Sequence, residues 1–288
     1  MNALTVYRPD SGQPLRNFLN PLHMARDLWA HRDLTMQLAR REVLGRYRSA
    51  RLGILWSGIT PFFSLIVYTF VFSGIFKARF TDNPAEGYAH FALYLFCGML
   101  VYNVFAEVAA RAPSIITENP NYVKKVVFPL EVMVPAVLMG ALFRMAVGFV
   151  AWLGFWTVLE RALPKPTLLL LPLVVLPLCL LTAGVAWLAA AVGVFVRDLA
   201  HAAGVVVQLL AFLTPVYYSI ERIQQPLLRA AMQLNPLSQT LEQTRRVAIV
   251  GGAPDWGWWL ASLTLSGAAC LLGYASFMKS KRAFGDVL

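Results

Sequence analysis

Residues 37–76 read QLARREVLGRYRSARLGILWSGITPFFSLIVYTFVFSGIF, and a change of character within this stretch decides the fold class. The first part is rich in arginine, whereas the 25 residues from Leu52 to Phe76 contain no charged side chain. At a rise of about 1.5 Å per residue, a helix of that length can cross a hydrocarbon core of about 30 Å with some tilt. Because arginines that precede an apolar span hold its start in the cytoplasm, the stretch predicts a membrane helix that begins inside.

The composition extends this interpretation to the whole chain. Hydrophobic residues make up 58% of the 288 residues, charged residues only 14%, and the mean hydropathy is +0.59. These values exclude a soluble globular protein and indicate an integral membrane protein with several helices. The formal net charge of +10 is spread among the segments between apolar runs, which favours cytoplasmic anchoring over nucleic-acid binding.

Six apolar runs are expected to span the membrane and to give an all-α fold. They cover residues 52–76, 88–112, 130–159, 168–196, 199–219 and 256–278. Residues 1–33 contain three prolines and no continuous apolar run, so they are expected to form a cytoplasmic tail rather than a cleaved signal peptide. Residues 34–288 then form one membrane domain. Sixteen of the 25 lysines and arginines fall in segments expected inside and eight outside, which supports a cytoplasmic location for both termini.

The segment before the first span, residues 34–51, carries five of these arginines. They are Arg40, Arg41, Arg46, Arg48 and Arg51. Several apolar side chains of the segment share one helical sector, but two of the arginines fall within it. The segment is therefore interpreted either as a positively charged anchor or as a helix that lies along the membrane surface.

The loop after the second span reads SIITENPNYVKKVVFPLEVMVP, residues 114–135. It combines a helix-capable piece at 114–119, a break at Pro120 and a basic pair, Lys124 and Lys125. One interpretation is a basic turn that connects two spans. The other is a short cytoplasmic helix that docks on a partner protein, with contacts from Glu118, Asn119 and Tyr122.

Residues 220–255 form a long outside segment with two helix-like pieces separated at Asn235 and Pro236. The first piece is expected to bury Leu227, Leu228 and Ala231 at helical spacing, with Leu234 as a further candidate. Neither piece is long or apolar enough to span, so the segment is either a surface loop or a pair of re-entrant helices on the outer face.

Two charged residues, Glu107 and Arg144, fall within expected spans, where they should pair with each other or line a wet cavity. The first span is also rich in aromatic residues, including Trp56, Phe62, Tyr68 and Phe72. Such a stripe is consistent with packing, and equally with a path for sugars, because aromatic faces stack on the C–H faces of pyranose rings.

Sequence motifs of catalysis are missing from the chain. It contains no GxxxxGK[ST] phosphate loop, no HExxH motif and no GxSxG motif, and its four histidines are scattered. Cys97, Cys179 and Cys270 lie in separate apolar runs without metal-ligand spacing. The sequence therefore predicts neither an enzyme nor a metal or cofactor site on this chain.

Several motifs, in this order, resemble the permease subunits of ABC-2-type exporters, specifically those of the polysaccharide branch that export O-antigen, capsule or teichoic acid. They are REVLGRYRSARLGILW at 41–56, NPNYVKKVVFPLEVMVP at 119–135, VFVRD at 194–198, TPVYYS at 214–219 and LNPLSQTLEQTR at 234–245. The resemblance covers most of the chain from residue 34 to residue 282, and the tail before it has no match.

The resemblance implies a dimer of this subunit in the bacterial inner membrane, together with two cytoplasmic ATPase subunits that bind ATP and magnesium. It assigns residues 114–125 to the helix that couples to the ATPase. It also implies re-entrant helices at 220–252 that close the pore. The substrate would be a polysaccharide on a polyprenyl diphosphate carrier, which the five arginines of residues 34–51 would receive. Trp56, Phe62, Tyr68 and Phe72 would then contact the glycan.

Three other functions are considered. A drug or lipid exporter of the same ABC-2 architecture would share the topology. An integral membrane glycosyl or acyl transferase would need clustered acid and base residues, which the chain lacks. A secondary transporter is expected to carry more central ionisable residues than Glu107 and Arg144.

Overall fold

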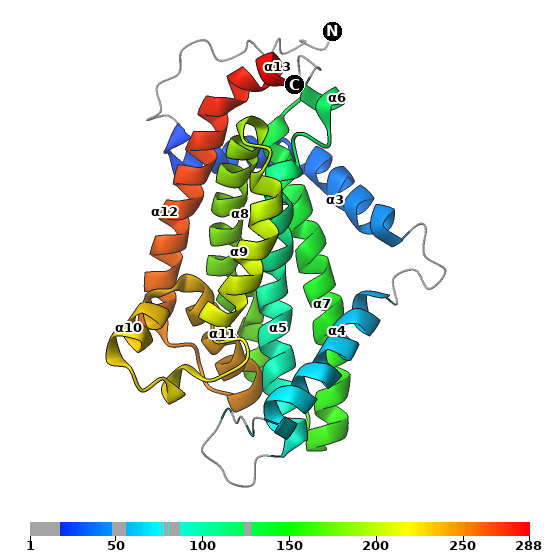
Figure 1. The fold of residues 1–288 in the computed structure, drawn as a ribbon, viewed down its shortest axis with the longest axis vertical. Coiled ribbons are helices and arrows are strands. Elements are labelled where there is room, and N and C mark those ends of the chain that lie inside the picture. The colour runs from blue at the N-terminus through cyan, green and yellow to red at the C-terminus, as the bar shows by residue number, and fades with distance from the viewer. Residues whose placement is uncertain (1–17, 48–55, 76, 78–79, 81–86, 124–127) are drawn as a thin grey trace.

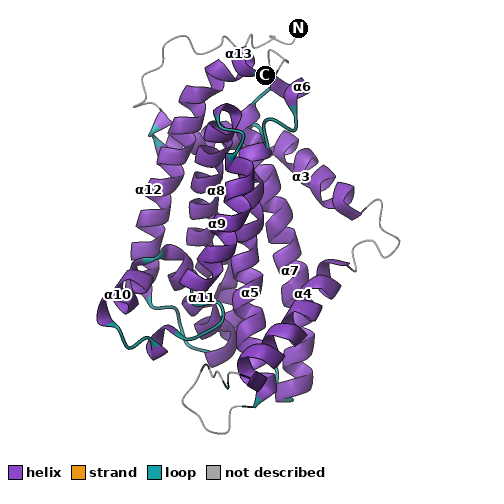
Figure 2. Ribbon diagram, viewed as in Figure 1, coloured by secondary structure: helices purple, strands orange, loops and turns teal. Residues whose placement is uncertain are grey.

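The structure is a computed structural model that describes residues 18–47, 56–75, 77, 80, 87–123 and 128–288. Every regular element in this part of the chain is a helix, as Figure 2 shows. The longest helices run side by side along the long axis (Figure 1). Helices α2, α3, α6 and α13 lie at one end of the bundle, here called the α6 end, and α10 and α11 lie toward the other, the α10 end.

Among the residues that the structure describes, four helical segments are long and apolar enough to cross a membrane: Tyr88–Ser114, Leu130–Glu160, Pro166–Phe195 and Trp256–Val287. Their α-helical parts are α5 (Tyr88–Arg111), α7 (Met133–Glu160), α8 (Leu171–Phe195) and α12 (Trp256–Ser280). The 3₁₀ turns η4 (Leu130–Val132) and η5 (Pro166–Leu170) precede α7 and α8, and η3 (Ala112–Ser114) follows α5. The turn η8 (Lys281–Ala283) and the short helix α13 (Phe284–Val287) follow α12. These four segments coincide with the second, third, fourth and sixth expected spans and confirm that those apolar runs are helical.

The other two expected spans correspond to shorter helices. Helix α4 (Trp56–Tyr68) continues into the π-helical η2 (Thr69–Ile75), and α9 covers Leu199–Leu213. The expected fifth span, 199–219, is too long, because the backbone at Thr214 is extended and Pro215 follows it. Proline disfavours the helical conformation of the residue before it and has no N–H to continue the helix.

Helices α8 and α12 make the most extensive contact between any two described elements. They meet at Gly184 and Gly273, where a Cβ atom on either glycine would strike backbone atoms of the other helix. Lipid tails are as apolar as the helix surfaces, so association depends on close packing, and small residues allow it. The two glycines therefore set the distance between these helices.

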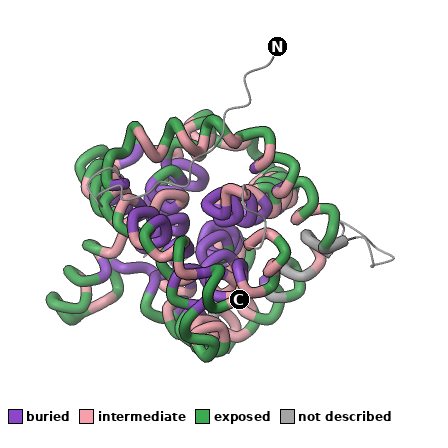
Figure 3. The backbone as a smooth tube through the Cα atoms, turned by 90° about the horizontal axis from the view of Figure 1, so that it is seen from above, coloured by how far each residue is buried: buried purple, intermediate pink, exposed green. Residues whose placement is uncertain are grey.

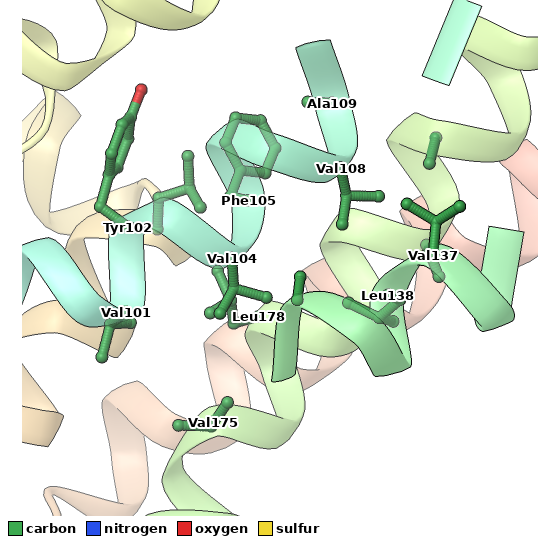
Figure 4. Packing of buried hydrophobic residues seen from close by; sticks show 14 of the residues in the cluster. Val101, Tyr102, Val104, Phe105, Val108, Ala109, Val137, Leu138, Val175 and Leu178 are labelled. Atoms are coloured by element: carbon green, nitrogen blue, oxygen red, sulfur yellow. The ribbon is translucent and has the colours of Figure 1, made fainter. Parts of the chain in front are cut away.

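Helix α5 occupies the centre of the bundle and contacts α4, α7, α8, α9 and α11. Figure 3 shows buried backbone grouped in the middle and exposed backbone around it. Figure 4 shows apolar side chains of α5, such as Val104 and Val108, near Leu138 of α7 and Leu178 of α8. The indole of the buried Trp152 donates a hydrogen bond of 3.0 Å to the Leu93 carbonyl, so its polar atom is satisfied within the core.

The first two described helices lie at the α6 end. They are α2 (Pro21–Ala30), capped by the Asn20 side chain, and α3 (Arg32–Tyr47), so helical structure begins within the segment expected as a tail. Asp27 of α2 lies 2.9 Å from His23 and accepts a 3.3 Å hydrogen bond from the Tyr274 hydroxyl of α12. Burial raises the pKa of the Asp27 carboxyl, which the charge of His23 opposes.

At the α10 end, the 3₁₀ turn η6 (Ile220–Arg222) leads to α10 (Pro226–Leu234), α11 (Pro236–Arg245) and the π-turn η7 (Arg246–Val250). The expected division into two helical pieces is correct, since Asn235 caps α11 and Pro236 begins it. The expected burial in α10 is wrong. Leu227 is 83% exposed, and Leu228, Ala231 and Leu234 are also exposed. The buried residue of α10 is Met232. Helical spacing identifies an apolar face of a helix, but it does not show whether other residues of the same chain pack against that face.

We predict that Gly273→Ala destabilises the protein by about 1–3 kcal/mol, because the added methyl group would strike backbone atoms that cannot move independently. The matched control is Gly267→Ala on the same helix, where a Cβ meets no atom within 4 Å. That change should be neutral or stabilise by up to about 1 kcal/mol, since alanine favours helix more than glycine does. Thermal unfolding in detergent measures both, and equal stability of the two variants would contradict the proposed close contact.

Candidate functional site

Two regions gather the polar and aromatic side chains that the sequence pointed to. The first is the segment that follows α5 at the α6 end. The second is a cavity between α4, α5 and α9.

The segment after α5 is folded by its own side chains. Ser114 donates hydrogen bonds to the Arg111 carbonyl at 3.1 Å and to the Glu118 carboxylate at 2.7 Å. The Asn119 side chain donates to the Ile115 carbonyl at 3.0 Å. The short helix α6 then covers Pro120–Val123. The expected break is therefore present between Asn119 and Pro120, and a new helix starts at Pro120 because proline needs no N–H partner at the first helical position.

Helix α8 holds this segment through a backbone contact. A Cβ atom on Gly193 of α8 would strike the carbonyl and Cα atoms of Pro113 in η3. Ile115 and Ile116, which follow η3, are buried in the hydrophobic core. The segment is thus anchored by packing at its start, while Glu118 and Asn121 are exposed.

Two arginines, one from α3 and one from α5, connect α3 with the same segment. Arg41 donates a 2.6 Å hydrogen bond to the Tyr122 hydroxyl, and its guanidinium lies 5.6 Å from the centre of the Tyr122 ring. Arg111 of α5 forms an ion pair with Glu42 of α3 and lies 3.7 Å from the Glu118 carboxylate. We refer to Arg41, Glu42, Arg111, Glu118 and Tyr122 as the α3–α6 cluster. It joins residues that the sequence assigned to two separate regions.

The Tyr122 ring also stacks on the ring of Phe128. Its ring centre lies 4.3 Å from that of Phe128, with an angle of 9° between the ring planes. Arg40, by contrast, is exposed on α3. The structure does not describe the side chains of five further predicted residues: Arg46, Arg48, Arg51, Lys124 and Lys125.

The second region is a cavity of about 530 Å³ lined by aromatic and amide side chains. Its polar lining consists of Tyr68 of α4, Tyr102 and Asn103 of α5, Gln208 of α9, and Tyr217 from the turn after α9. Tyrosine and amide side chains offer flat apolar faces together with hydrogen-bond donors and acceptors. This combination suits a ligand that carries both hydroxyl groups and C–H faces.

The tyrosine rings of this cavity contact one another across helices. The rings of Tyr68 and Tyr217 lie 5.3 Å apart at 67°, and Phe212 lies 5.3 Å from Tyr217. The Tyr102 hydroxyl donates to the Val207 carbonyl at 2.5 Å. Tyr217 therefore links α4 to the end of α9 within the cavity wall.

The predicted aromatic residues of the first span do not all reach this cavity. Phe62 stacks on Phe155 of α7, with ring centres 5.4 Å apart and planes 3° apart. It lines a different, apolar cavity of about 750 Å³ between α4, α5 and α7. For Trp56 and Phe72 the structure describes the backbone but not the side chains. Of the predicted set, Tyr68 is the residue that the structure places on the polar cavity.

Glu107 and Arg144 form a two-point ion pair between α5 and α7, with nitrogen–oxygen distances of 2.8 and 2.7 Å. They line a cavity of about 210 Å³ that shares Asn103 and Ala106 with the larger one. The pair offsets the cost of two charges at membrane depth.

Several cavity residues were not singled out from the sequence: Tyr102, Asn103, Gln208, Phe212 and Tyr217. A signal for two of them exists, because Asn103 and Gln208 are amides within otherwise apolar runs. Tyr217 lies in the TPVYYS motif, but nothing in the sequence indicates that its ring meets Tyr68.

The fold and these sites define an integral membrane protein in which α4, α5 and α9 line a cavity with tyrosine and amide side chains. The chain matches the ABC-2 type transporter family over residues 33–248, and it belongs to that family. It is similar to the O-antigen export system permease protein RfbA of Myxococcus xanthus, with 29% identity over 81% of this chain and 87% of the relative. Two proteins of the same name from Klebsiella pneumoniae are each 22% identical over 89% of this chain and 95% of the relative.

We predict a coupling energy of about 0.5–1.5 kcal/mol between Arg41 and Tyr122, because their hydrogen bond is lost in either single variant. A double-mutant cycle with Arg41→Ala and Tyr122→Phe measures this energy by unfolding of the purified permease. Phenylalanine keeps the stacking on Phe128. The matched control is Arg40→Ala, whose effect should simply add to that of Tyr122→Phe. Additive effects in both cycles would show that the Arg41 contact contributes nothing.

Proposed function

We propose that this chain is the transmembrane permease subunit of an ATP-driven exporter that moves a lipid-linked polysaccharide, with O-antigen as the best-supported cargo, outward from the cytoplasm across the bacterial inner membrane. The observation that carries the proposal is the similarity to the Myxococcus xanthus permease over most of both chains. Family membership supports the role of a transport component in an ABC transporter.

Energy for transport comes, in this proposal, from a partner chain. The sequence has no phosphate loop, so ATP and magnesium would be bound by two cytoplasmic ATPase subunits that assemble with two copies of this chain. The segment 114–125 is proposed to dock on the ATPase. Two observations support this proposal. The beginning of the segment packs against Gly193 of α8, and its later part exposes Glu118 and Asn121.

The α3–α6 cluster suggests how movement of the ATPase would reach the membrane domain. A displacement of α6 would act on α3 through the Arg41–Tyr122 hydrogen bond and on α5 through Arg111. Arg40 and Arg41 are also proposed to meet the diphosphate of a polyprenyl carrier, because arginine donates paired hydrogen bonds to phosphate oxygens.

The polar cavity between α4, α5 and α9 is the proposed contact surface for the glycan. Tyr68 and Tyr217 provide faces on which pyranose rings can stack, and Asn103 and Gln208 provide donors and acceptors for hydroxyl groups. Weak and repeated contacts of this kind permit movement along a path, since no single one holds the sugar tightly.

The proposed topology has six spans, with α4 and α9 as the first and fifth, and both termini in the cytoplasm. The α6 end would then face the cytoplasm and the α10 end the outside. Helices α10 and α11 would be re-entrant, which is consistent with the exposed apolar side chains of α10. The excess of lysine and arginine in the expected inside segments supports this orientation.

A second candidate is an ABC-2-type exporter of drugs or lipids. The apolar cavity between α4, α5 and α7, lined by residues such as Phe62, Phe70 and Leu159, favours it, because an apolar cavity at membrane depth suits a hydrocarbon chain.

We predict that Tyr122→Ala or Lys124→Glu impairs ATP-dependent glycan movement in proteoliposomes that contain the permease and its ATPase, while the complex still assembles. The Tyr122 change removes both the Arg41 hydrogen bond and the Phe128 stacking. Gly267→Ala on α12, where a Cβ atom meets no other atom within 4 Å, serves as the control and should leave transport unchanged. Normal transport and normal ATPase activity in both test variants would refute the docking assignment.

We also predict that Tyr68→Ala or Tyr217→Ala lowers glycan transport roughly tenfold, which corresponds to the loss of about 1.4 kcal/mol of stacking. The comparison is with Phe70→Ala, an exposed residue of the apolar cavity. Transport assays with glycan and with a fluorescent lipid separate the two candidates. A loss confined to lipid transport in the Phe70 variant would favour the lipid exporter instead.

A further inference from the structure

Arg245, at the end of α11, is almost completely enclosed, with 3% of its surface exposed. From the sequence, this residue belongs to the expected outside segment at 220–255. Its guanidinium donates hydrogen bonds to the carbonyls of Pro215 at 2.7 Å, Val216 at 2.8 Å and Tyr94 at 3.3 Å. It also pairs with Glu242 at 3.2 Å, so the charge is compensated within α11.

The neighbouring residues Phe80 and Gly98 fit closely around the guanidinium of Arg245. The guanidinium lies 4.5 Å from the centre of the Phe80 ring, which favours a cation above its face. On α5, Gly98 provides the necessary space, because a Cβ atom there would lie 2.5 Å from Nη2 of Arg245. Among the side chains, only that of arginine presents several N–H donors in one plane. A lysine at this position could not reach the three carbonyls together.

Two of the three carbonyls that Arg245 binds, those of Pro215 and Val216, belong to the turn that ends α9. Pro215 stops that helix, so the turn needs hydrogen-bond donors from elsewhere in the protein. Tyr217 follows these two residues directly, and its ring lines the polar cavity against Tyr68 and Phe212. The place of Tyr217 in the cavity wall therefore depends on a turn that a residue of α11 holds.

We propose that Arg245 is a positioning residue for transport: it joins α11, the outer half of α5 and the turn after α9 into one unit, so that Tyr217 moves only together with α11. In the resting state this unit keeps the Tyr68–Tyr217 contact closed across the cavity. The proposal rests on the proposed function, in that the cavity is taken as the path of the transported molecule.

The direct test measures the distance between the two tyrosine positions. Tyr68→Cys and Tyr217→Cys are introduced together into the complex with its ATPase, after replacement of the three native cysteines by alanine. A short thiol cross-linker should join the pair efficiently in the resting state. Arg245→Gln should lower the initial rate of cross-linking roughly tenfold, because the hydrogen bonds from the charged guanidinium to the turn are lost. Arg246→Gln, the exposed neighbour, should leave the yield unchanged.

Two further variants separate positioning from a general loss of stability. Gly98→Ala keeps the arginine but displaces its guanidinium, and it should reproduce the effect of Arg245→Gln on cross-linking. Glu242→Gln leaves the three carbonyl bonds in place and should cross-link nearly as the parent does. If Arg245→Gln does not assemble, Gly98→Ala provides the same measurement. Unchanged cross-linking in an assembled Arg245→Gln or Gly98→Ala complex would overturn the proposal.

Function is measured in the same set of variants with the native tyrosines. Without ATP, proteoliposomes with Arg245→Gln should leak a small anionic dye about tenfold faster than those with Arg246→Gln, while basal ATPase activity stays the same. An unchanged leak would contradict the resting closure. If cross-linking depends on Arg245 but no variant, nor the parent, moves glycan, then the proposed function fails and the positioning role stands.

Discussion

The contact of α8 with its neighbours at three glycines is the constraint on which the arrangement of the bundle depends. Gly184 meets Gly273 of α12, and Gly193 meets Pro113 in the segment after α5. Lipid-exposed helices gain little from apolar contact alone, so backbone approach of this kind decides which helices lie together. Because α8 contacts both α12 and η3, it fixes the start of the proposed coupling segment relative to the far side of the bundle.

Charge pairing adds a second level of order within the described residues. Arg144 pairs with Glu107, Arg245 with Glu242, and Lys281 lies 2.7 Å from the buried carboxylate of Glu131. Removing a charge from water is expensive unless a partner compensates it. The Glu107 and Glu131 pairs each join different elements, so the cost of burial is offset by contacts that also fix the register between helices.

The sequence predicted the helices that depend on local properties. Helices α5, α7, α8 and α12 follow from long apolar runs, and their ends were placed within a few residues. The failures occurred where a neighbour or a proline decides the outcome. Pro215 shortened α9, and Leu227 and Leu228 proved exposed although their spacing is helical. The pairing of Glu107 with Arg144 was foreseeable because an isolated charge at membrane depth is costly.

By itself, then, the sequence determined that this chain is an all-helical membrane protein, because hydrophobicity summed over about 20 residues is a local property. It also determined which residue types are available for sugars and phosphates. Only the tertiary structure decided how they are grouped. Phe62 and Tyr68 share one helix yet face different cavities, and Arg41 meets Tyr122 across 81 positions of sequence. The physical reason is that side-chain contacts between helices depend on rotation and tilt, which close packing at a few small residues sets and no local pattern encodes.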